Sequence, residues 1–188
     1  MEPLVAYEQL LGRLDAFFAR AQVRAGAELR CGPGCAECCA HDLSLFPVEV
    51  ERMVQAATRL PGPIRSAVLA RALRAAADAE APCPLLGEAG RCSIYSVRPV
   101  ICRTHGLPLL LPRGEGPPEL SLCALNFRGA ARLAGDAVLD LGPVNAVLAA
   151  VNHLWCQARG RSPERVRVAV AVAEALGALG PVETPGAP

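Results

Sequence analysis

The sequence predicts a small, mainly α-helical domain with cysteine-rich loops and one short β-hairpin. Three observations lead to this prediction. Hydrophobic residues make up 52% of the 188 residues but aromatic residues only 4%, so Leu, Val and Ala must build the core. Prolines stand where segments with helical spacing begin or end. Most of the nine cysteines fall in irregular segments that are rich in Gly and Pro.

Five segments have the apolar spacing of amphipathic helices. The first covers about 4–22, the second runs from Pro47 up to Pro61, and the third runs from Pro63 to about Glu80. The last two cover 144–157 and 162–179. We expect Ser162 to be the N-cap of the last helix, because Pro163 then occupies its first position. The valines between 166 and 172 alternate as in a strand, which argues against that helix.

The remaining structure is predicted from turns and from chain length. Residues 107–111 and 119–122 flank a Gly/Pro-rich turn and are predicted to form the hairpin. The length fits one domain, which we place at 1–180, with the cysteine-cluster region at 31–123. The Pro/Gly-rich residues 181–188 are predicted to be a disordered tail.

Charge and hydropathy exclude two classes of partner at this stage. The formal net charge is +1, from 19 basic and 18 acidic residues, which gives no large field to attract nucleic acid or an anionic membrane. No apolar stretch approaches about 18 residues, and the amino terminus lacks the basic and apolar regions of a signal peptide. We therefore expect a cytoplasmic protein with no nucleic-acid and no membrane partner.

The first four cysteines are the strongest chemical signal in the sequence. They form the pattern Cys31-x3-Cys35-x2-Cys38-Cys39. Nine cysteines are an odd number, and the cytoplasm keeps thiols reduced, so a disulfide framework is not expected. Closely spaced thiolates repel one another unless a cation holds them, and zinc and iron both accept thiolate ligands. The loops are therefore predicted to bind metal.

Four more cysteines follow at longer spacings, at Cys83, Cys92, Cys102 and Cys123. One zinc ion or one [4Fe–4S] cluster uses only four, so eight thiols make either one site closed by returning segments or two sites. The spacing does not say which cysteines share a site. Burial in the core is the alternative for the first three of these, and it is the favoured prediction for Cys156, which lies in an apolar helical segment.

Histidines and arginines near the cysteines give weaker signals. His105 is either an extra metal ligand or an exposed loop residue. His41 is a less favoured candidate for an extra metal ligand, and His153 is expected on a helix surface. Three arginines can offset the negative charge of a thiolate site or can simply face solvent. They are Arg91, Arg98 and Arg103.

The order of the cysteine motifs resembles one known family. The cluster at 31–39 is followed by Cys-Pro-Leu-Leu, Gly-x-Cys-Ser-Ile-Tyr, Arg-Pro-x-x-Cys-Arg and a later cysteine, an order similar to that of the YkgJ-type cysteine-cluster family. The resemblance covers about 31–123 and implies zinc or iron chelation. The ligands that it implies are Cys31, Cys35, Cys38, Cys39, Cys83, Cys92, Cys102 and Cys123.

Several functions remain open from the sequence. The first is a metal-binding protein that holds zinc or iron for structural, metal-handling or redox purposes. The alternative is an iron–sulfur protein, either an electron carrier or part of a redox or radical enzyme. The pattern Cys31-x3-Cys35-x2-Cys38 has the spacing of the radical-SAM cluster motif. Against a radical-SAM enzyme, Glu37 stands where that motif usually has an aromatic residue, and the sequence has no barrel pattern.

Two enzymatic hypotheses have less support in the sequence than metal binding, so whether the protein is an enzyme stays open. A catalytic zinc site would need a base such as Glu37 or Asp42, which nothing singles out. A nucleophilic Cys102 paired with His105 would need one isolated thiol instead of a cluster. No catalytic residue is assigned.

Overall fold

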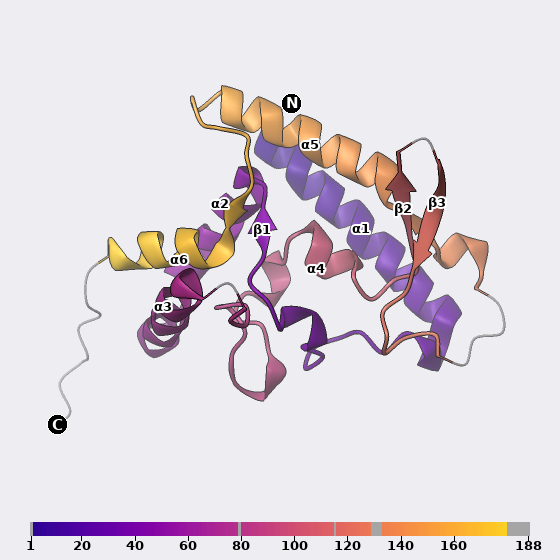
Figure 1. Ribbon diagram of the computed structural model, residues 1–188, viewed down its shortest axis with the longest axis horizontal. Helices are drawn as coiled ribbons and strands as arrows, with labels where there is room; N and C mark the ends of the chain where they lie inside the picture. Colours follow the sequence, from indigo (N-terminus) through magenta and orange to yellow (C-terminus); the bar gives the residue numbers. More distant parts are fainter. Residues whose placement is uncertain (1, 79, 115, 129–132, 180–188) are drawn as a thin grey trace. The chain divides into compact units, whose positions relative to one another are not determined.

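The computed structural model describes residues 2–78, 80–114, 116–128 and 133–179 (Figure 1). Its contacts divide the chain into two compact units. Unit 1 comprises Met1–Gly32 and Pro99–Pro163, and unit 2 comprises Pro33–Arg98 and Glu164–Pro188. One domain over 1–180 stays a prediction, and the expected tail at 181–188 lies outside the described residues.

Unit 1 is built on two long helices, α1 (Pro3–Ala25) and α5 (Leu141–Gln157), which pack against each other. The short helix α4 (Val100–Thr104) also contacts α1. The apolar stripe of α1 is buried as its spacing predicts, with Tyr7, Leu11 and Leu14 each at most 8% exposed. Helix α5 begins three residues before the predicted start, because the Asp140 carboxylate accepts a hydrogen bond from the Gly142 amide at 2.8 Å.

A small sheet completes unit 1. Strands β2 (Leu109–Arg113) and β3 (Gly116–Ser121) form an antiparallel pair, with Leu109 opposite Ser121. The predicted hairpin is therefore confirmed. Strand β4 (Leu139–Asp140) adds to β2 in parallel and leads directly into α5.

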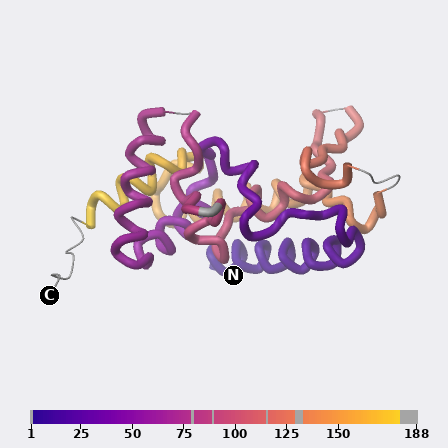
Figure 2. Tube along the Cα trace, turned by 90° about the horizontal axis from the view of Figure 1, so that it is seen from below, coloured from indigo at the N-terminus to yellow at the C-terminus, as the bar shows by residue number. Residues whose placement is uncertain are grey.

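Unit 2 packs three helices, α2 (Pro47–Thr58), α3 (Gly62–Ala77) and α6 (Val168–Gly177). The C-terminal α6, yellow in Figure 2, lies against α3 and also contacts α2. A two-stranded sheet pairs β1 (Ser44–Leu45) with β5 (Val166–Arg167) in antiparallel register. The core of this unit consists of Leu45, Val50, Met53, Ala57, Val68, Ala72, Leu85, Ile94, Val168, Val172, Ala173 and Leu176.

Helix boundaries in unit 2 also differ from the predictions. The third helix ends at Ala77, near the expected end, but the last helix begins at Val168 instead of Ser162. Ser162 is therefore not its N-cap, and the strand-like valine pattern is partly real, because Val166–Arg167 pairs with β1. Within the described residues, every helix is too short or too polar to cross a membrane.

Candidate metal centre

A tight turn brings Cys83 and Cys92 together in unit 2. The Gly87 amide donates to the Arg91 carbonyl at 2.7 Å, and the Ser93 amide donates to the Leu85 carbonyl at 2.8 Å. Leu86 and Cys92 face each other as an antiparallel bridge. The two thiols are close enough that each ionised sulfur would repel the other.

Backbone amides donate to both sulfur atoms of this turn. The amides of Leu85 and Leu86 donate to Cys83, and the amide of Ile94 donates to Cys92. These amides are held firmly, since the Leu85 and Ile94 side chains are 0% and 4% exposed in the unit 2 core. Amide donors favour a thiolate over a thiol, and here they offset part of the effect of burial, which favours the thiol.

The first cysteine loop packs against the same turn. The Cys83 amide donates to the Cys39 carbonyl at 3.0 Å. Gly90 has a φ of +67°, and a Cβ there would lie 2.9 Å from the Gly34 carbonyl oxygen, so glycine is required for the close approach. Cys38, in the 3₁₀ turn Glu37–Cys39, lies near enough to Cys92 for their charges to interact.

These surroundings raise the pKa of two thiols. Burial raises the pKa of Cys83 to about 11, and the nearby Cys92 and Asp42 add to the effect. Burial and then the Cys38 sulfur raise the pKa of Cys92, while the Arg98 guanidinium opposes the shift. Burial and the neighbouring sulfurs therefore disfavour the thiolate form of Cys83 and Cys92 when no cation is bound. A thiophilic cation such as zinc or iron fits this donor set.

The predicted ligands divide between the units. Cys35, Cys38, Cys39, Cys83 and Cys92 belong to unit 2, whereas Cys31, Cys102 and Cys123 belong to unit 1. All eight are half-buried, and none of the nine cysteines forms a disulfide. In the part of the chain that the structure describes, no three His, Cys, Asp or Glu side chains are already arranged to hold a metal ion. The ligand set stays a prediction.

Cys156 differs from the other cysteines. It lies on α5 with 1% of its surface exposed, and its thiol donates to the side-chain Oδ1 of Asn152 at 3.5 Å. The prediction that it packs in the core is confirmed.

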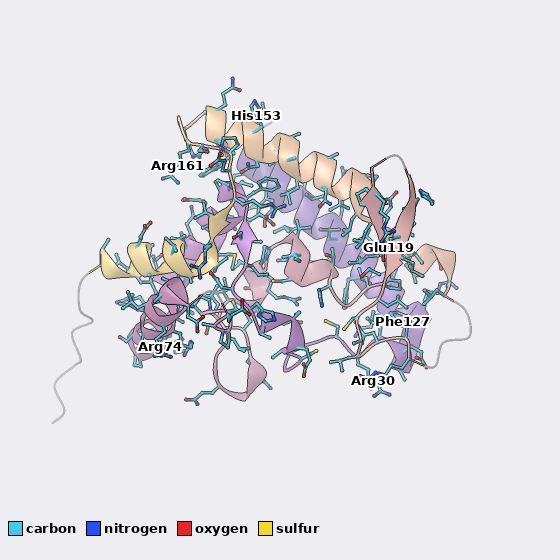
Figure 3. The ribbon with its side chains drawn as sticks, viewed as in Figure 1. Arg30, Arg74, Glu119, Phe127, His153 and Arg161 are labelled. Carbon is cyan, nitrogen blue, oxygen red and sulfur yellow. The ribbon has the colours of Figure 1, made fainter. Side chains whose placement is uncertain are left out.

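In unit 1, the buried side chain of Asn126 joins the three segments that carry Cys31, Cys102 and Cys123. Its oxygen accepts from the Arg30 amide at 3.0 Å, and its nitrogen donates to the Gly106 carbonyl at 2.7 Å. Its own amide donates to the Cys123 carbonyl at 3.0 Å. Figure 3 shows Arg30 and Phe127 close together at this junction. No sequence pattern pointed to Asn126, because its partners lie 20 and 96 residues away.

Gly106 is the second constraint at this junction. A Cβ at this position would overlap the Cys31 side chain, at 2.8 Å from its sulfur. The backbone after Cys102 therefore lies directly against Cys31.

We expect Asn126→Ala to lower the free energy of unfolding by about 1–3 kcal/mol, because it leaves the buried Gly106 carbonyl and the partly buried Arg30 amide without their partner. Urea denaturation of the metal-free protein measures this. Asn145→Ala, at an exposed position of α5, is the matched control and should change little. Equal midpoints for the two variants would show that the junction does not depend on Asn126.

All three histidines are exposed, including His105 and His41, which the sequence offered as possible extra metal ligands. His105 and His153 are exposed, and Figure 3 shows His153 pointing away from α5. His41 is exposed and lies 3.8 Å from Glu80, an ion pair that forms only when the imidazole is protonated. The expectation that His153 lies on a helix surface is confirmed.

The arginines beside the cysteines have different contacts. Arg103, next to Cys102, is 7% exposed, and its Nη1 lies 2.5 Å from both carboxylate oxygens of Asp15, which ties α4 to α1. Arg98 stacks on the Tyr95 ring at 3.6 Å, and its charge lowers the pKa of Cys92, a predicted ligand. Arg91 is exposed.

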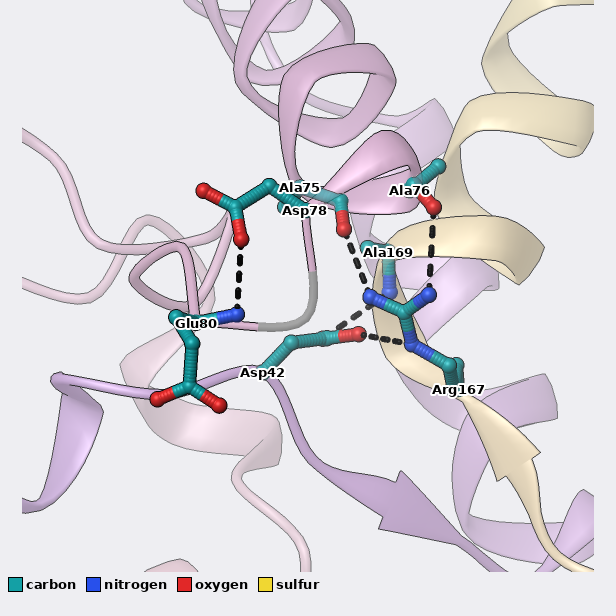
Figure 4. Close-up of polar contacts among 7 residues, drawn as sticks. All are labelled: Asp42, Ala75, Ala76, Asp78, Glu80, Arg167 and Ala169. Carbon is teal, nitrogen blue, oxygen red and sulfur yellow. Dashed lines mark hydrogen bonds and ion pairs between the residues drawn. The ribbon is translucent and has the colours of Figure 1, made fainter.

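Asp42, a candidate general base from sequence, is held in a structural network instead (Figure 4). Its side chain is 1% exposed; one oxygen accepts from Arg167 Nε at 3.2 Å and the other from the Ala169 amide at 3.1 Å. The Arg167 guanidinium also donates to the carbonyls of Ala75 and Ala76. Asp42 therefore caps α6 and joins it to the end of α3.

The raised pKa of Cys83 predicts a pH dependence of stability in the metal-free protein. The thiol ionises near pH 9 when the chain is unfolded but near 11 when it is folded. Below pH 9 both states are protonated, so stability is unaffected; between 9 and 11 only the unfolded state loses the proton, and stability falls by up to about 1.4 kcal/mol per pH unit. Denaturation at several pH values, compared with Cys83→Ser, measures this. An equal alkaline loss in the variant would contradict the assignment to Cys83.

Comparison with known proteins adds one finding. Residues 30–110 match the model of a family described as "CxxCxxCC: Putative zinc- or iron-chelating domain". The match supports metal binding in general and confirms the resemblance to a cysteine-cluster family. It includes the first seven predicted ligands and ends before Cys123. No curated protein and no solved structure matches the chain.

Proposed function

We propose that the protein binds zinc or iron through thiolates of unit 2, centred on Cys38, Cys83 and Cys92, since residues 30–110 match the model of a family described as zinc- or iron-chelating. The observation that carries the proposal is the family match over 30–110, and the backbone turn that brings Cys83 and Cys92 together supports it. A cation removes their mutual repulsion and replaces their protons.

Further ligands come from the same loop and from unit 1. Cys35 and Cys39 lie next to Cys38 in the loop and are the candidates to complete the unit 2 site. Cys31, Cys102 and Cys123 are proposed as a separate group of thiolates, whose segments Asn126 joins. These five cysteines are proposed from the family resemblance alone, whereas the grouping of Cys38, Cys83 and Cys92 also has structural support.

A structural or metal-handling role in the cytoplasm is the first candidate function. Cytoplasmic thiols stay reduced, and thiols are what this site needs. An iron–sulfur protein with an electron-transfer role is the second, since four thiolates hold a cluster as well as they hold zinc, and amide donors to sulfur tune cluster potentials.

One experiment tests the proposal and separates the two candidates. The protein is purified without oxygen, its visible absorption is recorded, and zinc, iron and acid-labile sulfide are measured per chain. A colourless protein with zinc supports the first candidate, and matching iron and sulfide with broad absorption supports the second. A protein that holds neither metal, even after incubation with zinc or ferrous iron, would overturn the proposal.

A further inference from the structure

A pocket of about 410 Å³ lies in unit 2, lined by one face of α3 and by the turn at 87–93. The residues of α3 that line it are Pro63, Ile64, Ala67 and Arg71. They recur every three to four residues and therefore share one side of the helix. The volume is near the lower end of the range for small-molecule sites, so the pocket suits a small organic molecule.

The side chain of Arg71 reaches from α3 to the segment that leads into this turn. It is half-buried, and its Nε donates to the Pro84 carbonyl at 2.9 Å. This bond fixes the guanidinium and leaves its Nη1 and Nη2 groups for another acceptor. In the part of the chain that the structure describes, Arg71 has no carboxylate partner. A fixed guanidinium without a carboxylate partner is a donor for an added oxyanion.

The charges of the lining favour a single carboxylate. Arg71 and Arg91 each contribute one positive charge and Glu88 one negative charge, which leaves a net charge of +1. One carboxylate neutralises this charge, whereas a phosphate monoester carries about −2 at pH 7 and would leave excess negative charge beside Glu88.

The α3 wall offers an apolar surface to the rest of such a molecule. Pro63 and Ala67 are exposed, and Ile64 is 44% exposed, which is unusual for a large apolar side chain. On the turn wall, a Cβ at Gly87 would lie 3.5 Å from the Ser93 hydroxyl oxygen, so this hydroxyl lies beside the lining and is a further donor.

We propose that this pocket binds a small monocarboxylate, whose carboxylate pairs with the Arg71 guanidinium and whose carbon skeleton lies on Ile64 and Ala67. The second positive charge, on Arg91, attracts the anion from the turn side. This binding goes beyond the proposed function, because it is noncovalent and involves neither a metal nor a thiolate.

Benzoate is the probe, and benzamide, which has the same ring without the charge, is the ligand control. Isothermal titration calorimetry of the full-length protein is expected to show that benzoate binds at least about tenfold more tightly than benzamide. Phenyl phosphate should bind more weakly than benzoate. Equal affinity for benzoate and benzamide, or no binding of benzoate at millimolar concentrations, would overturn the proposal. Tighter binding of phenyl phosphate would overturn the assignment to a carboxylate.

Arginine variants locate the binding. Arg71→Gln is expected to weaken benzoate binding about tenfold, and Arg91→Gln severalfold, without a change for benzamide. Arg74→Gln is the matched control: it removes the same charge from an exposed position of α3, labelled in Figure 3, that does not line the pocket. Equal benzoate affinity in Arg71→Gln and Arg74→Gln would overturn the site. If Arg71→Gln does not fold, equal affinity in Arg91→Gln and Arg74→Gln would overturn it.

A third pair of variants tests the shape of the pocket. Ala67→Trp fills it with a large ring and is expected to weaken benzoate binding at least about tenfold. Ala77→Trp is exposed on the same helix, about 15 Å along the axis, and should not change the affinity. Unaltered benzoate affinity in a folded Ala67→Trp variant would place benzoate outside this pocket and overturn the inference.

Discussion

Cys38→Ser and Cys92→Ser are each expected to weaken metal binding by at least about a hundredfold, because each removes one of the coupled thiolates in unit 2. Thermal stability of the metal-loaded protein should fall in parallel, since a metal that binds only the folded chain stabilises it. Metal per chain after dialysis against a weak chelator and the thermal midpoint with and without metal measure the two effects.

Cys156→Ala is the control for this prediction. Its thiol is buried on α5 and bonded to Asn152, so the change should cost about 1–2 kcal/mol of stability and leave the metal content unaltered. Unchanged metal in both Cys38→Ser and Cys92→Ser would remove these residues as ligands. Loss of metal in Cys156→Ala would place the site in the wrong unit.

Asp42→Ala is expected to lower the free energy of unfolding by about 3–5 kcal/mol, which is a large part of the stability of an ordinary domain. The change leaves the Arg167 guanidinium without its carboxylate and the Ala169 amide without its cap. Equilibrium urea denaturation of the metal-free protein, followed by circular dichroism, measures the loss.

Two further variants separate the contributions of this network. Asp42→Asn keeps an oxygen for the Ala169 amide but removes the charge facing Arg167, so it should cost less than Asp42→Ala. His41→Ala removes the neighbouring, exposed pair with Glu80 and should cost less than about 1 kcal/mol. If Asp42→Ala costs no more than His41→Ala, the buried network does not hold α6.

Helices whose signals are local were predictable from the sequence. The apolar stripe of α1 and the proline at the start of α2 lie within their own segments, and both helices begin within a residue of the prediction. The start of α6 was not predictable, because its cap comes from Asp42, which is 127 residues from Ala169 in sequence. Ser162 and Pro163 are residue types typical of a helix start, but they lie in a loop, where the Asn152 side chain donates to the Pro163 carbonyl at 3.0 Å.

The candidate site was predictable in composition but not in grouping. Cysteine spacing identified the thiols, and the family match over 30–110 confirms the cysteine-cluster resemblance. Spacing could not show that Cys83 and Cys92 share one turn, because the pairing depends on backbone bonds of Leu85, Gly87 and Ser93. Nor could it show that Asn126 holds Arg30 and Gly106, since a lone asparagine in a loop carries no pattern.

The discontinuity of unit 2 has a consequence for synthesis on the ribosome. The cysteine loop and α3 are translated first, but the strand and helix that complete their core follow only after residues 99–163. At about 5–20 residues per second, that delay lasts roughly 3–13 s. For that time the nascent chain exposes the thiols of the loop without Arg167 and α6 behind them. On the proposed function, metal can therefore reach the loop before the core of unit 2 is complete.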